Sequence, residues 1–309
     1  MWEKLFYREK GLFLQSLHPA AALVYLLVLL LLSLLYENPL YLLALFFLLA
    51  LLVCEADGLK AWEGFLRAGL FLMVLIALVN PLVIRAGKTI LWQGPEVHFL
   101  GKLQVSLEAI YYGITSGIRF LVIISIFCLY NLIINPDKLL NLLAGFAHHS
   151  ILIVALATRM FPAMVRNLQR IKEVQELRGV DFGRGRLWER AKKYSCLYSV
   201  LLLSSLEDAM GIAESMQARA FGSGKRSLYT RNLLRPRDVF CLGSSLGAFL
   251  LALWGLHHGF GRYTFYPEAD VLVKDGTSLV VLFVVFVGLS GPLVLSKGWR
   301  HCRFLKSKI

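Results

Sequence analysis

Apolar runs separated by short polar breaks make up most of this chain, and one long polar stretch interrupts them. Six of the runs come close to the length that crosses a bilayer as a helix, roughly 20 residues. They cover about residues 20–36, 40–54, 68–84, 110–134, 239–256 and 277–296. We therefore predict an all-α polytopic membrane protein with about six transmembrane helices and a long cytoplasmic helical segment.

Composition and charge support this assignment and orient it. The mean hydropathy is +0.63, and 57% of the residues are hydrophobic. Residues 135–238 hold 17 of the 33 lysines and arginines but only nine acids, and the tail after residue 296 is also basic. Because basic residues gather on the cytoplasmic side, an even number of spans predicts that both termini and this segment are cytoplasmic. The net charge of +13 then has a membrane explanation, and no nucleic-acid partner is expected.

Three regions follow from this topology. Residues 1–135 hold the first four transmembrane helices, residues 136–238 form the cytoplasmic segment, and residues 239–309 hold the last two helices and the basic tail. The five cysteines show no metal-binding spacing and are expected to be small buried apolar residues.

The cytoplasmic segment has the pattern of two amphipathic helices. In the first, apolar residues recur at spacings of three and four, Pro162 should break or kink the helix, and Gly179 should end it. The second is expected over about residues 194–220. Its first third is apolar enough to leave a seventh span open, but Glu207 and Asp208 make a full crossing costly and favour a core-facing helix. The apolar stripes include Leu156, Met160, Met164 and Leu168 in the first helix and Leu206, Met210 and Ala213 in the second.

Each of these helices ends in a short arginine-centred motif. The first ends in Leu177-Arg178-Gly179 and the second in Ala218-Arg219-Ala220. One arginine near a helix C-terminus needs no explanation beyond the helix dipole. Two of them, each followed by a small residue that allows another backbone to approach, indicate docking sites for a soluble partner.

Other kinds of site find little support. Gly87-Lys88-Thr89 and Gly224-Lys225-Arg226 lack the remaining residues of a phosphate-binding loop, so no ATP hydrolysis by this chain is expected. Adjacent histidine pairs do not have the spacing of metal ligands on a helix, and no catalytic pair or cofactor site is evident. Arg119, the single charge within a predicted span, is interpreted either as a snorkelling side chain or as a contact to a neighbouring membrane subunit.

These motifs, in this order, resemble the transmembrane T component of energy-coupling factor (ECF) transporters, which are ATP-driven importers of vitamins and transition-metal ions. That family carries two Ala-Arg-Gly-type motifs at the ends of its cytoplasmic coupling helices. Here Leu177 and Ala220 depart from the pattern, and both arginines remain. The resemblance covers about residues 10–300 and also includes Leu17-His18-Pro19, Asn80-Pro81-Leu82, Arg159-Met160-Phe161-Pro162 and the stretches 135–140 and 207–221.

The resemblance implies a non-catalytic subunit in a bacterial or archaeal plasma membrane. Two ABC ATPase subunits would receive the two arginine motifs, and a membrane-embedded substrate-binding subunit would pack on the apolar stripes. Two alternatives remain at this point. A conventional ABC permease subunit would usually carry a single short coupling helix, and an intramembrane hydrolase would need paired acidic and histidine residues inside the spans.

Overall fold

The computed structural model describes residues 13–84, 89–97, 101–143, 148–224, 234–266, 272 and 276–301. It divides into two compact units, one formed by Met1–Leu139 with Asn232–Ile309 and the other by Leu140–Arg231. The sequence predicts a basic, loop-like return to the membrane over residues 225–237, of which residues 225–233 lie outside the described residues. The tail after residue 301 and Cys302 lie outside them as well. Except for one β-hairpin, the regular structure of the described residues is helical, as predicted.

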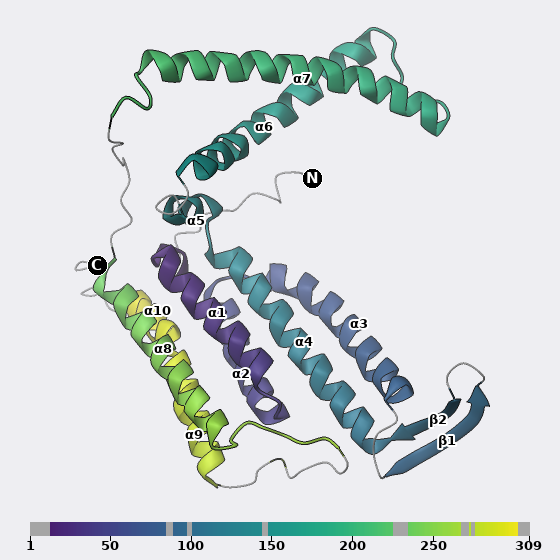
Figure 1. Ribbon diagram of the computed structural model, residues 1–309, viewed down its shortest axis with the longest axis vertical. Helices are drawn as coiled ribbons and strands as arrows, with labels where there is room; N and C mark the ends of the chain where they lie inside the picture. The colour runs from purple at the N-terminus through teal and green to yellow at the C-terminus, as the bar shows by residue number, and fades with distance from the viewer. Residues whose placement is uncertain are drawn as a thin grey trace. The chain divides into compact units, whose positions relative to one another are not determined.

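The first unit is a bundle of apolar helices. Helix α4 packs against α1 and α2, α8 packs against α1, α9 packs mainly on α8, and α3 lies at the edge of the bundle beside α4 (Figure 1). The bounds are α1 (Pro19–Leu35), α2 (Pro39–Glu55), α3 (Leu59–Val83), α4 (Leu107–Ile133), α8 (Pro236–His257), α9 (Gly276–Leu289) and α10 (Gly291–His301).

Local sequence explains where several of these helices begin. His18 and Asn38 each precede a proline and accept a hydrogen bond from the backbone N–H two residues on, at 3.2 and 3.0 Å. Proline suits the first helical position because its missing N–H would have no intrahelical partner there. Ser106 caps α4 in the same manner through the N–H of Ala109.

Side-chain hydrogen bonds tie the apolar helices together. The Tyr25 hydroxyl donates to the carbonyl of Leu289 at 2.9 Å, and the Trp62 indole N–H donates to the Ser125 hydroxyl at 3.0 Å. Such bonds satisfy buried polar groups that would otherwise be left unpaired inside the bundle.

Close backbone approach joins α3 to α4. A Cβ atom added at Gly117 would lie 2.6 Å from Cγ of Met73, and one at Gly113 would lie 3.2 Å from Cα of Ala77. These two glycines form a small-xxx-small spacing, which lets membrane helices pack tightly without large side chains between them.

The lengths of the helices fit an all-α polytopic membrane protein. Within the described residues, four helices are long and apolar enough to span a bilayer, and the bent pair α9–α10 makes a possible fifth. Helices α1 and α2 have 17 residues each, at the lower limit for a span. One of the four is α7 (Leu187–Ala218), the second helix of the predicted cytoplasmic segment, so the six-span count stays a prediction. The four are Leu59–Pro81, Leu107–Ile133, Leu187–Ala218 and Pro236–His257.

Three predictions were wrong in detail. Helix α3 begins at Leu59, nine residues before the expected start, because its charged first turns are good helix formers and Arg67 pairs with Glu63 one turn away. Residues 90–106 hold an antiparallel hairpin of β1 (Ile90–Val97) and β2 (Gly101–Ser106), where only a loop was expected. Of the cysteines, Cys54 and Cys196 are exposed and not buried.

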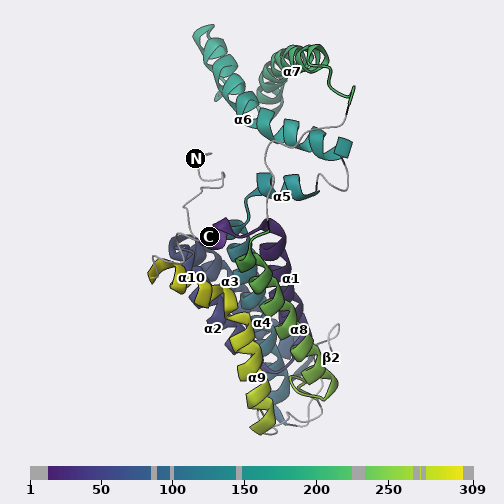
Figure 2. The same cartoon turned by 90° about the vertical axis from the view of Figure 1, so that its left-hand side faces the viewer.

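The second unit contains two long helices, α6 (His148–Leu177) and α7 (Leu187–Ala218). The short helix α5 (Pro136–Leu143) lies across the boundary between the units, and Pro136 stands in its first turn, where proline is tolerated. Pro162 does not break α6, which continues through it, and Figure 2 shows one bend between two straighter parts of the helix. Helix α7 begins seven residues before the expected start, because the Glu189 carboxylate accepts a hydrogen bond from the Arg186 N–H and stabilises an earlier first turn.

Candidate functional site: two arginine-capped helix ends

The end of α6 forms a complete Schellman motif around Arg178. The Arg178 N–H still makes the last helical bond, to the carbonyl of Val174, and Gly179 then adopts a left-handed conformation with φ +88°. The N–H of Val180 bonds back to Gln175 at 3.0 Å, and that of Gly179 bonds to Glu176 at 2.9 Å. This pairing satisfies carbonyls that the helix end leaves free. Gly179 therefore ends the helix as predicted, and Arg178 occupies the cap position.

The end of α7 repeats this geometry around Arg219. Arg219 is the cap residue and bonds to Ser215, and Ala220 takes the left-handed position with φ +54°. The N–H of Phe221 bonds to Met216 at 3.0 Å, and that of Ala220 bonds to Gln217 at 2.9 Å. Both arginines thus leave the same position of the same backbone motif. Arg178, Gly179, Ala218, Arg219 and Ala220 are all exposed.

Ala220 carries a conformational cost that Gly179 avoids. A side chain beyond glycine makes the left-handed region unfavourable by about 1–2 kcal/mol. We expect Ala220→Gly to strengthen the α7 end by about 1 kcal/mol and to leave docking intact. Hydrogen exchange of the Phe221 amide should slow several-fold in this variant. Unchanged or faster exchange would contradict the left-handed assignment.

The two arginine ends are far apart within the unit. Gly179 and Val180 line the same open hollow as Tyr194, which lies in the second turn of α7. Arg219 follows 25 residues later (219 − 194), which is about 37 Å of helix. Figure 1 shows the end of α6 and the C-terminal end of α7 on opposite sides of the helix pair. The motifs therefore offer two separate contact sites and not one combined site.

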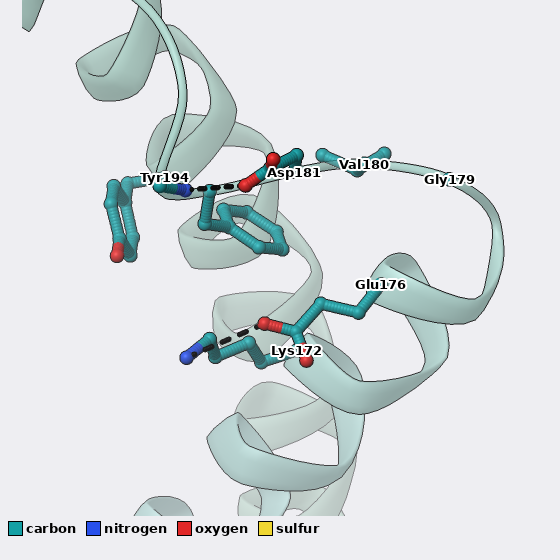
Figure 3. A pocket seen from close by; sticks show the side chains of 8 residues that line it. Lys172, Glu176, Gly179, Val180, Asp181 and Tyr194 are labelled. Atoms are coloured by element: carbon teal, nitrogen blue, oxygen red, sulfur yellow. Dashed lines mark hydrogen bonds and ion pairs between the residues drawn. The ribbon is translucent and has the colours of Figure 1, made fainter.

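The loop between the two helices is held in place by α7. The Lys193 ammonium donates to the carbonyls of Asp181 and Arg184 at 2.7 and 3.0 Å, and the Phe182 ring lies 5.4 Å from that of Tyr194. Beside it is an open hollow of about 500 Å³, lined in part by the Lys172–Glu176 ion pair (Figure 3). This loop was not predicted as part of a site. Its signal was the series of glycines, with Asp181 accepting a hydrogen bond from the N–H of Gly183.

The predicted apolar stripes differ in exposure. Along α6 the stripe is half-buried at Leu156, Met160 and Met164 and exposed at Leu168. Along α7 the predicted stripe is open, with Leu206 61% and Met210 58% exposed and Ala213 exposed as well. The core-facing prediction for α7 was therefore wrong, because its buried apolar residues are Leu197 and Leu201, on another side of the helix.

Arg119 has a partner within the chain. Its guanidinium donates a hydrogen bond of 3.0 Å to the carbonyl of Tyr36, which is the C-cap residue of α1. A cation suits this place because the C-terminal end of a helix carries partial negative charge. The side chain thus stabilises the packing of α4 on α1, a role that neither sequence interpretation included.

A second buried polar cluster joins the starts of α1 and α8. The Asp238 carboxylate, 1% exposed, accepts hydrogen bonds from the N–H groups of His18 and Arg235 at 3.1 and 2.9 Å. The neighbouring Arg237 guanidinium donates to the Ser16 carbonyl at 2.8 Å. This cluster gives a structural reason for the Leu17-His18-Pro19 motif. The contact itself joins residues 220 positions apart, so the sequence held no signal for it.

Comparison with known proteins decides the family. The family model CbiQ, described as cobalt transport protein, matches residues 11–229. The chain belongs to this family. It is also 24% identical to the energy-coupling factor transporter transmembrane protein EcfT of Thermosediminibacter oceani over 214 residues, which cover 66% of this chain and 76% of the relative. The EcfT of Macrococcus caseolyticus is 25% identical over 256 residues, 78% of this chain and 93% of the relative.

A third relative shows higher identity over a shorter stretch. The EcfT of Streptococcus equi subsp. equi is 31% identical over 175 residues, which cover 52% of this chain and 65% of the relative. Together the matches confirm the predicted resemblance: the chain is the transmembrane T component of an ECF transporter and a multi-pass membrane protein. The proteins of the matched family are components of transporters.

Proposed function

We propose that this chain couples ATP hydrolysis by two ABC ATPase subunits to the movement of a substrate-binding membrane subunit. The transported cargo would be a vitamin or a transition-metal ion, and the chain itself would catalyse no reaction. The observation that carries the proposal is the repeated helix end, with an exposed arginine at the same cap position in both motifs.

Docking of an ATPase at each arginine agrees with the chemistry of the two ends. A guanidinium stays charged when it is partly buried and makes bidentate hydrogen bonds with carboxylates. The Schellman backbone fixes the direction of the Cα–Cβ bond of each arginine, so no backbone at the helix end has to be ordered on binding. Because the ends are separate, each can enter the groove of a different ATPase subunit.

The apolar stripes supply the second contact of the proposal. Leu206 and Met210 stand open on α7, and burial of such side chains by a partner is favourable by roughly 25 cal/mol per Å² of apolar area. Methionine adapts its shape to different neighbours. These stripes suit the apolar surface of a substrate-binding subunit.

Coupling then follows from the rigidity of the helix pair. The loop that joins α6 to α7 is held by the Lys193 hydrogen bonds, so movement of one helix end is transmitted to the other helix. ATP binding would draw the two ATPases together and shift both arginine ends. The stripes would move with them and topple the substrate-binding subunit that they contact.

Purification of the complex tests this function. We expect the full chain, isolated in mild detergent from its native membrane, to carry two ABC ATPase subunits and a small membrane protein. Adding ATP should stimulate uptake only when all of these subunits are reconstituted together. Isolation of the chain with a periplasmic-type binding protein and no small membrane subunit would contradict the proposal.

The proposal places residues 136–238 and both termini in the cytoplasm, because the lysines and arginines are concentrated there. Single cysteines introduced at Gly94 and Lys274 should react with an impermeant thiol reagent from outside the cell. A cysteine at Arg184, whose side chain is 91% exposed, should react only after the membrane is opened. Labelling of Arg184→Cys from outside would overturn the topology. The neighbouring Gly185 is less suitable for a cysteine than Arg184, because its φ of +119° disfavours any residue with a side chain.

A further inference from the structure

The start of α7 displays large apolar side chains among basic ones. Leu187 and Trp188 are 85% and 83% exposed. Residues 184–193 contain five lysines and arginines and one acid. The coupling role proposed above uses Lys193, but neither the apolar pair nor the other basic residues of this stretch have a role in docking or coupling.

The acids near this surface are already engaged within the loop. The Glu189 carboxylate accepts a hydrogen bond from the Arg186 N–H at 3.2 Å, and the Asp181 carboxylate accepts one from Gly183 at 2.8 Å and lies 3.4 Å from the Arg184 guanidinium. Lys193 is likewise held on two loop carbonyls. The remaining charge is therefore positive and directed outward.

Trp188 and Lys192 belong to one side of α7. They are four residues apart, and side chains at that spacing are neighbours on a helix. Both are exposed, as is Arg186 at the cap position of the helix. The surface thus combines an indole and a leucine with at least two outward cations.

This combination is typical of the interface between a membrane and water. An indole ring prefers the level of the lipid headgroups, and cations close to a membrane surface are attracted by anionic lipids. The second unit also begins at Leu140 and ends at Arg231, so both of its ends continue directly into the unit that contains the membrane bundle. The surface therefore belongs to a chain that resides in a membrane.

We propose that the start of α7 binds the anionic phospholipid headgroups of the membrane in which the chain resides. Arg186, Leu187, Trp188 and Lys192 make this contact. The contact goes beyond the proposed coupling function, and it requires no ATPase and no substrate-binding subunit. It gives the loop end of the helix pair a fixed position on the membrane.

The fluorescence of Trp188 tests the proposal in the full chain. The chain is reconstituted alone into vesicles of phosphatidylcholine, or of phosphatidylcholine with brominated phosphatidylglycerol, and the signal of Trp188→Phe is subtracted to isolate Trp188. We expect clear quenching of Trp188 by the brominated anionic lipid. Quenching should fall as salt rises, because exposed charges are screened within about 8 Å at 0.15 M ionic strength.

Charge reversal provides the matched comparison. Arg186→Glu with Lys192→Glu should weaken the lipid contact roughly tenfold or more, since each cation near the surface adds to the attraction. Arg166→Glu with Arg170→Glu makes the same change of charge at exposed positions of α6 and should leave Trp188 quenching unchanged. An equal loss of Trp188 quenching in the two double variants would overturn the proposal, because the effect would then follow the net charge of the chain alone.

A second readout covers the case in which the charge-reversed chain does not fold. An environment-sensitive fluorophore at Trp188→Cys, in a chain whose five native cysteines are replaced, should shift to shorter wavelength in anionic vesicles and not in neutral ones. A signal that is indifferent to lipid charge and changes only when ATPase subunits are added would overturn the proposal. It would identify this surface as a protein contact, whereas the arginine docking would be tested separately by ATPase binding.

Discussion

A chain that carries Arg178→Glu together with Arg219→Glu should insert into the membrane normally and bind no ATPase subunits. Truncating one partner of a desolvated charge pair costs about 2–5 kcal/mol, in part because the other charge is left unpaired. Reversal adds repulsion between like charges. Since the two ends are separate sites, one change should weaken the complex and two should abolish it. Co-purification of ATPases with the epitope-tagged chain measures the effect, and uptake should be lost with it.

Two controls separate docking from local stability. Glutamate at a helix C-terminus also opposes the helix dipole, so Arg178→Gln with Arg219→Gln should still lose most of the ATPase. Arg166→Glu with Arg170→Glu reverses two exposed charges on α6 and should retain it. Lysine at positions 178 and 219 should be only partly tolerated, because it lacks the planar fork of arginine. Wild-type yield of ATPases with the double glutamate variant would show that these arginines are ordinary helix-end charges.

A chain with Met164→Asp and Met210→Asp should lose the substrate-binding subunit and keep its ATPases. Met210 is 58% exposed, so an aspartate there costs the isolated unit little, whereas a partner that buries the stripe would have to desolvate the new charge. Met164 is half-buried, and its change should weaken the same contact from α6. Pull-down through the chain, followed by quantification of each subunit, measures the result.

The conservative pair Met164→Leu with Met210→Leu serves as the control and should retain all subunits, because leucine keeps the apolar area at similar volume. Simultaneous loss of both partners in the aspartate variant would mean that the stripes hold the two helices to each other. The open side of α7 around Met210 argues against that outcome.

Helix ends could be predicted from this sequence where a single residue type determines the backbone. Gly179 indicated the end of α6, and it takes the left-handed conformation that glycine permits. At the end of α7 the same conformation falls on Ala220, which no propensity indicates. The expected helix therefore continued through residue 220, two residues past the observed Ala218. Here the backbone bonds of the Schellman motif outweigh the preference of alanine.

Helix starts were harder to predict because charged residues serve both loops and helices. The charged first turns of α3 and the Glu189 residue that caps α7 both lie within helices. A prediction based on the apolar run alone places the start of each helix later. The missed hairpin is similar, since β2 alternates polar and apolar residues over only six positions. Short alternation of this kind is weak evidence beside long apolar runs.

Contacts between distant segments were beyond reach of the sequence. The Arg119 bond to Tyr36 joins residues 83 apart, and the Asp238 bond to His18 joins residues 220 apart. Their roles depend on how the bundle packs, which the hydrophobic pattern does not specify. The arginine motifs, by contrast, are local, and their placement at two equivalent helix ends could be predicted from the sequence.

Site-specific photocross-linking tests the docking claim most directly. A photoreactive amino acid replaces Leu177, which is 89% exposed beside Arg178, or Ala218 beside Arg219, in the full complex in native membranes. The same amino acid at Ile153, 67% exposed near the other end of α6, is the control. Our account predicts cross-links from positions 177 and 218 to ATPase subunits and none from position 153. Cross-links from positions 177 and 218 to lipid or to the substrate-binding subunit, with no ATPase adduct, would contradict it.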